Sequence, residues 1–138
     1  MTRLEVVAGI VLRAGRVLAA RRAEGGPRGG CWELPGGKVE PGEQEPQTLA
    51  RELREELELA VSVGRRFLTV EHDYPDLRIR LHAYLCRAGG EPTAREHQAL
   101  RWLAPDELLA VAWSAADRLL VEALQRAIAA GELAVEGL

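Results

Sequence analysis

Three glutamates in one predicted helix, Glu52, Glu55 and Glu56, have the spacing in this sequence that most directly indicates chemistry. At about 100° per residue, positions i, i+3 and i+4 share one helix face within roughly 100° of arc. Like charges at these spacings repel one another, and a divalent cation would screen them. A hard cation such as Mg²⁺ takes oxygen ligands from carboxylates and from substrate phosphates. The alternative is a solvated acidic face, and three glutamates alone favour that alternative.

The segment around these glutamates changes the balance, because its spacing resembles the Nudix box. That motif is a glycine, five residues, a glutamate, seven residues, and then Arg-Glu-apolar-x-Glu-Glu-x-Gly-apolar. The matching residues are Gly37, Glu43, Arg51, Glu52, Leu53, Glu55, Glu56 and Leu59. One position departs from the motif, since Glu58 stands where the family has its second glycine. That glycine suits a left-handed helix cap, so the glutamate is expected to cost about 1 kcal/mol or to shift the cap by one residue.

The resemblance covers nearly the whole chain and looks most like the MutT branch of the family, which hydrolyses nucleoside triphosphates. It includes the segments WELPGGKVEPGE, EHQALRW and SAAD. It implies an α/β/α sandwich with a mixed sheet, in which the box forms a loop–helix–loop. It also implies Mg²⁺ or Mn²⁺ and attack by metal-activated water on the β-phosphorus. The products would be a nucleoside monophosphate and pyrophosphate.

Carried over residue by residue, the resemblance implies a metal site that combines helix carboxylates with a backbone carbonyl and a more distant acid. The expected ligands are the Gly36 carbonyl, Glu52, Glu55, Glu56 and Glu96. The same four glutamates are the expected catalytic residues, and either Glu52 or Glu96 is the base for the attacking water. Cations held there would polarise the phosphoryl oxygens and lower the pKa of bound water.

Other residues are expected to support this site or to contact the phosphates. Glu43 and Arg51 are expected to pair and, with Gly37 of the box, to hold the loop against the helix. Arg22 matches a phosphate-contacting arginine, and a guanidinium suits phosphate through its bidentate fork. Lys38 could offer a further cation. The alternative for both basic residues is a solvated side chain at a strand end or in a loop.

The choice of base is open at this stage. Asp117 occupies the position where MutT-like enzymes carry an asparagine that reads oxidised guanine. An ionised aspartate offers only acceptors, which favours an exocyclic amino group such as cytosine N4, although guanine also has one at N2. The structural alternative is a start like a capping box at Ser114. The family's base-side arginine aligns with Leu77, and the neighbouring Arg78 could substitute for it.

The elements that must position these residues are strands and helices without regular βαβ alternation, which predicts an α+β sandwich. No linker or repeat interrupts residues 1–138, so one domain is expected. Periodicity and turn residues predict strands at 4–12, 17–21, 31–34, 61–72, 78–87 and 100–103. They predict helices at 45–57 and 114–130, a short helix from 105 to 109, and a turn at Gly36-Gly37.

Composition excludes several classes of protein. Hydrophobic residues make up 47% and charged residues 28% of the 138 residues, as in soluble globular proteins. Eighteen basic against 21 acidic residues give a net charge of −3, the wrong sign for binding a nucleic-acid polymer through bulk charge. Two cysteines cannot form a disulfide framework, and the apolar run at 6–12 is too short to span a membrane. A reduced, cytoplasmic protein without a membrane partner is expected, and its oligomeric state cannot be predicted.

Hydrolysis of a nucleoside triphosphate is therefore the expected function, with an oxidised deoxynucleotide such as 8-oxo-dGTP slightly ahead as substrate. That would be cleaning of the nucleotide pool, an aid to DNA repair. Hydrolysis of CTP, dCTP or 5-methyl-dCTP is the alternative. ADP-ribose or a dinucleoside polyphosphate is a less favoured substrate, because the resemblance outside the box is to the MutT branch. A non-catalytic Nudix-fold module that senses a nucleotide or binds a partner is the alternative of a different class. Intact box glutamates argue against it.

Overall fold

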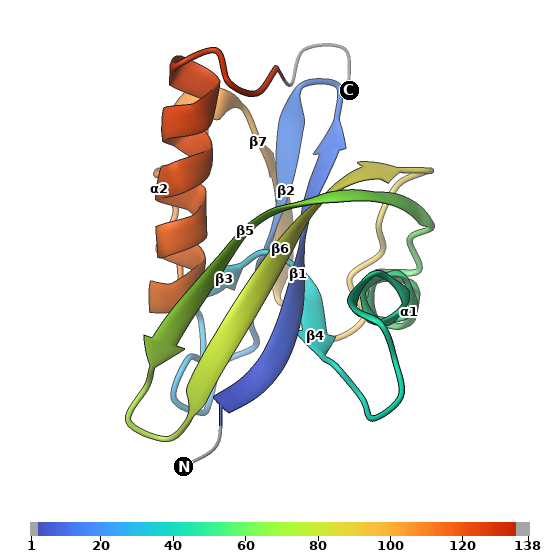
Figure 1. Cartoon of the computed structure of the whole chain (residues 1–138), viewed down its shortest axis with the longest axis vertical. Helices are drawn as coiled ribbons and strands as arrows, with labels where there is room; N and C mark the ends of the chain where they lie inside the picture. The colour runs from blue at the N-terminus through green and yellow to red at the C-terminus, as the bar shows by residue number, and fades with distance from the viewer. Residues whose placement is uncertain (1–2, 135–138) are drawn as a thin grey trace.

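A computed structural model describes residues 3–134, which form one mixed seven-stranded sheet between two helices (Figure 1). The strands are β1 Arg3–Arg13, β2 Arg16–Arg21, β3 Trp32–Glu33, β4 Gly36–Lys38, β5 Val61–Asp73, β6 Arg78–Ala88 and β7 Ala99–Leu103. The helices are α1 Glu45–Leu57 and α2 Ala115–Ala129, with a 3₁₀ turn at Pro105–Glu107. The expected α+β sandwich with a mixed sheet is confirmed.

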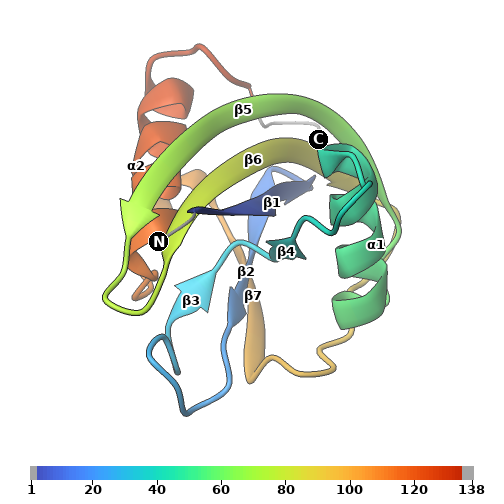
Figure 2. The same cartoon turned by 60° about the horizontal axis from the view of Figure 1, so that its bottom comes forward.

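Strand β1 is the centre of the sheet. It runs parallel to β6 from the pair Arg3–Arg78 to the pair Leu12–Arg87, whereas its pairs with β2 and β4 are antiparallel. The main path is β3-β2-β1-β6-β5, and β7 extends the sheet beside β2. Figure 2 shows β5 and β6 curving together over the rest of the sheet. Register shifts between Val63 and Leu68 interrupt the β5 ladder, as bulges do where a strand bends.

Alternation along β1 sends its side chains into two separate cores, one on each face of the sheet. Val7 and Val11 pack with the buried leucines of α1, while Ala8, Ile10 and Leu12 pack with those of α2. Helix α1 buries an apolar sector, Leu49, Leu53 and Leu57, against the sheet. Because that sector is fixed against the sheet, the adjacent sector that carries the box carboxylates is fixed as well.

The predicted turn at Gly36-Gly37 is wrong, because these residues form β4 and pair with Val7 and Ala8 of β1. Both glycines have negative φ, so their conformation alone does not require glycine. Space requires it at Gly36, where an added Cβ would lie 1.9 Å from the carbonyl oxygen of Val7. The close approach of β4 to β1 therefore depends on a residue without a side chain.

Helix α1 has the predicted bounds and ends at the departure from the box motif. Glu58 is its C-cap and has left-handed backbone angles, φ 49° and ψ 38°. The cap has therefore not shifted, and the glutamate takes the conformation that glycine adopts without strain. At the end of α2 the C-cap is Ala130, and the left-handed residue that follows it is a glycine, Gly131, with φ 73°.

We expect Glu58→Gly to raise the free energy of unfolding by about 1 kcal/mol, because it removes the strain of a left-handed non-glycine residue. Urea denaturation measures this change. The matched control is Arg54→Gly, which places glycine on an exposed site within the same helix and should cost about 1 kcal/mol. Equal losses in both variants would mean that Glu58 is not strained.

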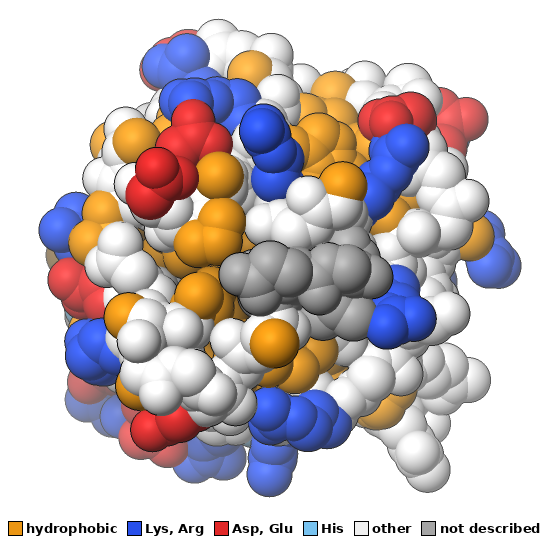
Figure 3. Space-filling model, turned by 90° about the horizontal axis from the view of Figure 1, so that it is seen from above, with side chains coloured by type: hydrophobic (Ala, Val, Ile, Leu, Met, Phe, Trp, Pro, Cys, Tyr) orange, Lys and Arg blue, Asp and Glu red, His pale blue; other side chains and the backbone are white. Residues whose placement is uncertain are grey.

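No helix within residues 3–134 is both long and apolar enough to cross a membrane. Figure 3 shows the face at the top of Figure 1, where basic and acidic side chains are interspersed and separated by apolar ones. On that face, residues 3–134 form no continuous basic surface of the kind that binds a nucleic-acid backbone.

Candidate active site

Helix α1 carries the three box glutamates on its open side, and the structure brings the distant Glu96 to them. Glu52, Glu55, Glu56 and Glu96 line one surface pocket together with Arg95. Glu96 comes from the segment between β6 and β7, which is joined to α1 by a hydrogen bond from the Arg95 N–H to the Glu56 carbonyl (3.4 Å). Four carboxylates thus face one volume.

Glu56 is the most buried of these four acids. Burial is the main cause that raises its pKa to about 7, and the charge of Glu52 acts in the same direction. Burial also raises the pKa of Glu52. The Oε2 atom of Glu56 is buried and has no hydrogen-bond partner among residues 3–134. A buried acceptor without a hydrogen-bond donor, next to another acid, is costly unless a cation compensates its charge.

A divalent cation fits this set of donors. Oxygen ligands from several carboxylates are what Mg²⁺ and Mn²⁺ prefer, and such a cation would offset both the mutual repulsion and the burial of Glu56. Gly36 of β4 and Glu56 line the same neighbouring pocket.

Arg51 holds the acidic face together from the side of the preceding loop. Its guanidinium donates two hydrogen bonds to Glu43, of 2.7 and 2.9 Å, which is the pair expected from the sequence. It also donates to Glu52 (3.2 Å) and Glu55 (3.1 Å). Its hydrogen bonds lower the pKa of Glu43 to about 2. The guanidinium of Arg51 therefore joins Glu43 of the loop to two of the box carboxylates.

Gly37 gives Glu52 the room it occupies. A Cβ added at Gly37 would lie 2.4 Å from the carboxyl carbon of Glu52. The box glycine is therefore a spatial requirement of the acidic face, because any side chain on β4 at this point would displace that carboxylate.

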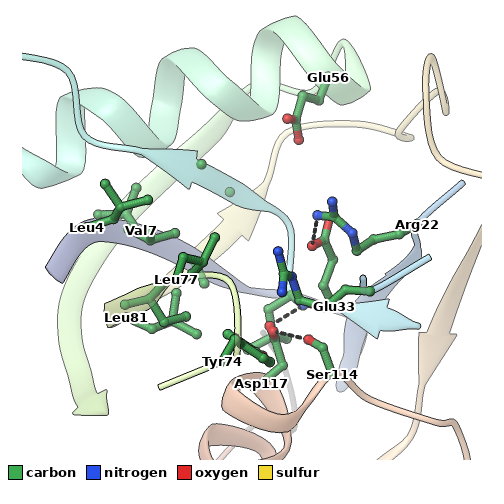
Figure 4. A pocket seen from close by; sticks show the side chains of 17 residues that line it. Leu4, Val7, Arg22, Glu33, Glu56, Tyr74, Leu77, Leu81, Ser114 and Asp117 are labelled. Atoms are coloured by element: carbon green, nitrogen blue, oxygen red, sulfur yellow. Dashed lines mark hydrogen bonds and ion pairs between the residues drawn. The ribbon is translucent and has the colours of Figure 1, made fainter. Parts of the chain in front are cut away.

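A deeper pocket of about 330 Å³ adjoins the acidic face, and Glu56 belongs to its lining (Figure 4). One side of this pocket is apolar and includes Leu4, Val7, Leu77 and Leu81, whereas the other side is polar. The polar lining is Arg22, Arg28, Glu33, Ser114 and Asp117. We call this pocket of about 330 Å³ the deep pocket. An apolar cleft with a few convergent polar groups is the usual form of a small-molecule site.

Arg22 is placed where it could meet an anion between the deep pocket and the acidic face. It lines the deep pocket and also a shallower one shared with Glu56 and Glu96. Its guanidinium donates to Glu33 (3.1 Å), whose other oxygen contacts His97 Nε2 (2.9 Å). That contact raises the pKa of His97. Glu33 therefore orients both a candidate phosphate-binding arginine and a buried histidine.

Asp117 lies at the polar side of the deep pocket and is 8% exposed. Its Oδ1 accepts from the Leu34 N–H (2.8 Å) and its Oδ2 contacts the Ser114 hydroxyl (2.6 Å). Ser114 is the N-cap of α2, but its side chain makes no capping bond to the helix backbone. Asp117 thus ties the strand end at Leu34 to the start of α2 and still lines the pocket. Burial raises its pKa to about 7.

The pH dependence of stability tests this burial. The unfolded chain ionises Asp117 near its ordinary pKa of about 3.9, whereas the folded chain keeps the proton until about pH 7. The stabilisation from this acid is complete below the lower value and is lost as pH rises through the higher one. Between pH 5 and 8 we expect it to fall by about 2–3 kcal/mol.

The variant Asp117→Asn should lack this slope, because its amide can bond Leu34 and Ser114 without ionising. Urea denaturation of both proteins at pH 5, 6, 7 and 8 gives the difference. Glu56 has a slope of the same sign, and it cancels because both proteins contain it. Parallel curves would contradict the raised pKa of Asp117.

Two residues expected to contact substrate lie elsewhere. Lys38 is exposed on β4 and is absent from the lining of the deep pocket. Arg78 also lies outside that lining and pairs with Asp73 (3.6 Å), while its neighbour Leu77 faces the pocket. Side chains alternate along an extended chain, which explains why only one of the two neighbours points inward.

Other pocket residues could not be identified from the sequence. Arg28, Glu33, Tyr74 and His97 reach the site from four segments and belong to no motif of fixed spacing. Nothing in the local sequence shows that Arg28, in the glycine-rich segment between β2 and β3, would contact Tyr74.

A separate cluster lies near the other end of α1. Glu5, Glu45 and His82 each place one ligand atom within 4.8 Å of the others, so they could hold a metal ion. They come from β1, α1 and β6, which is why no ligand spacing appears in the sequence. Both ring nitrogens of His82 already have partners, Nδ1 in Thr69 (2.8 Å) and Nε2 in Glu5 (2.8 Å). In this state His82 is a buried histidine with its hydrogen bonds satisfied.

Comparison with known proteins places this geometry among relatives. A family description named "NUDIX domain" matches residues 6–123. The CTP pyrophosphohydrolase of Escherichia coli K12 is 42% identical over 124 residues, which cover 89% of this chain and 92% of that protein. The 8-oxo-dGTP diphosphatase of the same organism is 33% identical over 105 residues, 75% and 81% of the two chains. The solution structure of the E. coli ORF135 protein superposes with a TM-score of 0.84, at 41% identity and 94% coverage of each chain.

Proposed function

Because the chain belongs to the NUDIX domain family, as a MutT-like pyrophosphohydrolase of nucleoside triphosphates, we propose that it cleaves an oxidised deoxynucleotide such as 8-oxo-dGTP. The products are the monophosphate and pyrophosphate, and the reaction depends on Mg²⁺ or Mn²⁺. The observation that carries the proposal is the convergence of four carboxylates beside a pocket of about 330 Å³, with Glu56 bordering both. Such an activity would clean the cytoplasmic nucleotide pool and so assist DNA repair.

In this proposal the residues that hold the cation are Glu52, Glu55, Glu56, Glu96 and the Gly36 carbonyl. A cation bound there supplies Lewis-acid polarisation of the phosphoryl oxygens and lowers the pKa of water. Glu52 or Glu96 accepts the proton of the attacking water. Arg51, paired with Glu43, keeps Glu52 and Glu55 at their positions.

Arg22 binds the triphosphate in this proposal. Its guanidinium lies between the deep pocket and the carboxylates, where phosphates would pass from a bound base to the cation. Glu33 accepts from Nη1 of this guanidinium, and the remaining N–H donors can bind phosphate oxygens. Lys38 and Arg78 lie outside the lining of the deep pocket, and their contact with the substrate stays a prediction.

Cytosine nucleotides are the second candidate class, on two specific observations. A relative of 42% identity is named CTP pyrophosphohydrolase, and a carboxylate at Asp117 can accept from cytosine N4. The mechanism at the phosphates is the same for both classes, so they differ only in the contacts of the base.

Kinetics on a panel of nucleotides test the proposal. With Mg²⁺, kcat/KM is measured for 8-oxo-dGTP, dGTP, CTP, dCTP and 5-methyl-dCTP. We expect the highest value for 8-oxo-dGTP. A higher value for the cytosine nucleotides would move the assignment to the second class and retain the reaction. Turnover of none of them would contradict hydrolysis and favour a Nudix-fold module that binds nucleotides without cleaving them.

A further inference from the structure

We infer that Arg28 and Asp117 read the base jointly, and that they select bases which carry both a ring carbonyl and an exocyclic amino group. The inference rests on the proposed function, because it assumes that the base of a nucleoside triphosphate enters the deep pocket. It assigns Arg28 as a specificity-determining residue, which no motif of the sequence indicated.

Arg28 is held rigidly although its loop is rich in glycine. Its Nη1 and Nη2 atoms donate to the two carboxylate oxygens of Asp76, at 3.0 and 3.1 Å. Its guanidinium carbon lies 4.5 Å from the centroid of the Tyr74 ring. A bidentate pair and a stacked ring together fix the plane of a guanidinium. The loop between β2 and β3 is thereby tied to the hairpin between β5 and β6, and Arg28 lines the pocket beneath.

The guanidinium has hydrogen-bonding capacity left for a ligand. It carries five N–H donors and no acceptor, and Asp76 uses two of them. The remaining donors can bond a carbonyl oxygen of a base but cannot pair with an amino group. An adenine ring, which has no carbonyl, would leave them without a partner.

Asp117 has the complementary chemistry and lines the same pocket as Arg28. The Tyr74 hydroxyl accepts from the N–H of Ala116, the residue before Asp117, while the Tyr74 ring carries Arg28. Figure 4 shows Tyr74 and Asp117 side by side at the polar side of the pocket. Above pH 7, where Asp117 is ionised, each carboxylate oxygen accepts one hydrogen bond from the protein and retains a second lone pair. That lone pair can accept from an amino group, which uracil and thymine lack.

The pair therefore defines a class of base. Cytosine offers O2 and N4, and guanine offers O6 and N2, whereas adenine and thymine each lack one of the two groups. The apolar side of the pocket, with Leu4, Leu77 and Leu81, can contact the faces of any ring and discriminates little. A site built to form hydrogen bonds rejects ligands that leave its buried polar groups unpaired.

Steady-state kinetics with dCTP, dGTP, dATP and dTTP test the inference. The native protein should prefer dCTP and dGTP. Arg28→Ala should lower kcat/KM for these two by about tenfold to a hundredfold, mainly through KM, and leave dATP unchanged. Arg28→Lys keeps the charge without the fork and should give an intermediate loss. Asp76→Asn releases Arg28 from its carboxylate partner without removing it. This variant should also lower kcat/KM for dCTP and dGTP relative to dATP.

The control is Arg101→Ala, which removes an exposed arginine of β7 outside the pocket lining. It should leave kcat/KM for all four nucleotides unchanged. Equal losses for all four nucleotides in Arg28→Ala, or no loss, would overturn the inference and leave hydrolysis intact. If Arg28→Ala lowers the melting temperature strongly, Arg28→Lys and Asp76→Asn decide by the same pattern. Failure of the native protein to cleave any of these nucleotides or 8-oxo-dGTP would instead remove the proposed function itself.

Discussion

Replacing Glu56 with glutamine is expected to lower kcat by about a thousandfold, because it removes a charge from the centre of the acidic face. The side chain keeps its shape, so the loss isolates the carboxylate. The free energy of unfolding should be unchanged or higher above pH 7, since the buried carboxyl has a pKa raised to about 7 and glutamine need not ionise. Steady-state hydrolysis and urea denaturation measure the two effects.

Glu58→Gln is the matched control, because it makes the same chemical change two residues further on, at an exposed cap. It should leave kcat within about twofold, as surface substitutions away from a site usually do. Similar losses from both substitutions, or a large loss of stability in Glu56→Gln, would show that Glu56 acts through folding and not through chemistry.

Alanine substitutions at the two adjacent glycines of β4 are expected to have different effects, a loss of activity at Gly37 and a loss of stability at Gly36. At Gly37 the new Cβ would meet the carboxylate of Glu52, a flexible end that can move, so the fold should lose less than about 1 kcal/mol. Activity should fall by about a hundredfold, because a displacement near 1 Å costs that much at a reacting centre. At Gly36 the Cβ would meet the backbone of β1, which cannot move.

We therefore expect Gly36→Ala to lose about 3 kcal/mol or more of stability, since overpacking against backbone has no easy relief. Measuring melting temperature and kcat on both variants separates the two effects. Gly37→Ala with native kcat would contradict the placement of Glu52 in the reaction. Gly36→Ala with native stability would contradict the close pairing of β4 with β1.

Local pattern predicted the part of the molecule in which neighbours in sequence are neighbours in space. Helix 45–57 was predicted with its observed bounds, because helix-forming residues, a proline in the first turn and an apolar sector all indicate the same element. The shared face of Glu52, Glu55 and Glu56 follows from helix geometry alone. The pair between Glu43 and Arg51 followed from their place in a motif.

Contacts made across the fold were not predictable in this way. Arg28 and Asp76 are 48 residues apart, and only the sheet brings their loops together. Two glycines in succession indicated a turn, but at Gly36 the reason for glycine is the close backbone of β1. Asp117 accepts a hydrogen bond from the Leu34 N–H, 83 residues away, which a capping pattern at Ser114 does not indicate.

Cleavage of 8-oxo-dGTP in ¹⁸O-labelled water, with Mg²⁺ and product analysis by ³¹P NMR, tests most directly whether the acidic face directs water to the β-phosphorus. We predict a nucleoside monophosphate without label and pyrophosphate that carries ¹⁸O. Both should be absent with EDTA and reduced about a thousandfold in Glu56→Gln. Label in the monophosphate, release of orthophosphate, or equal turnover by Glu56→Gln would contradict this chemistry.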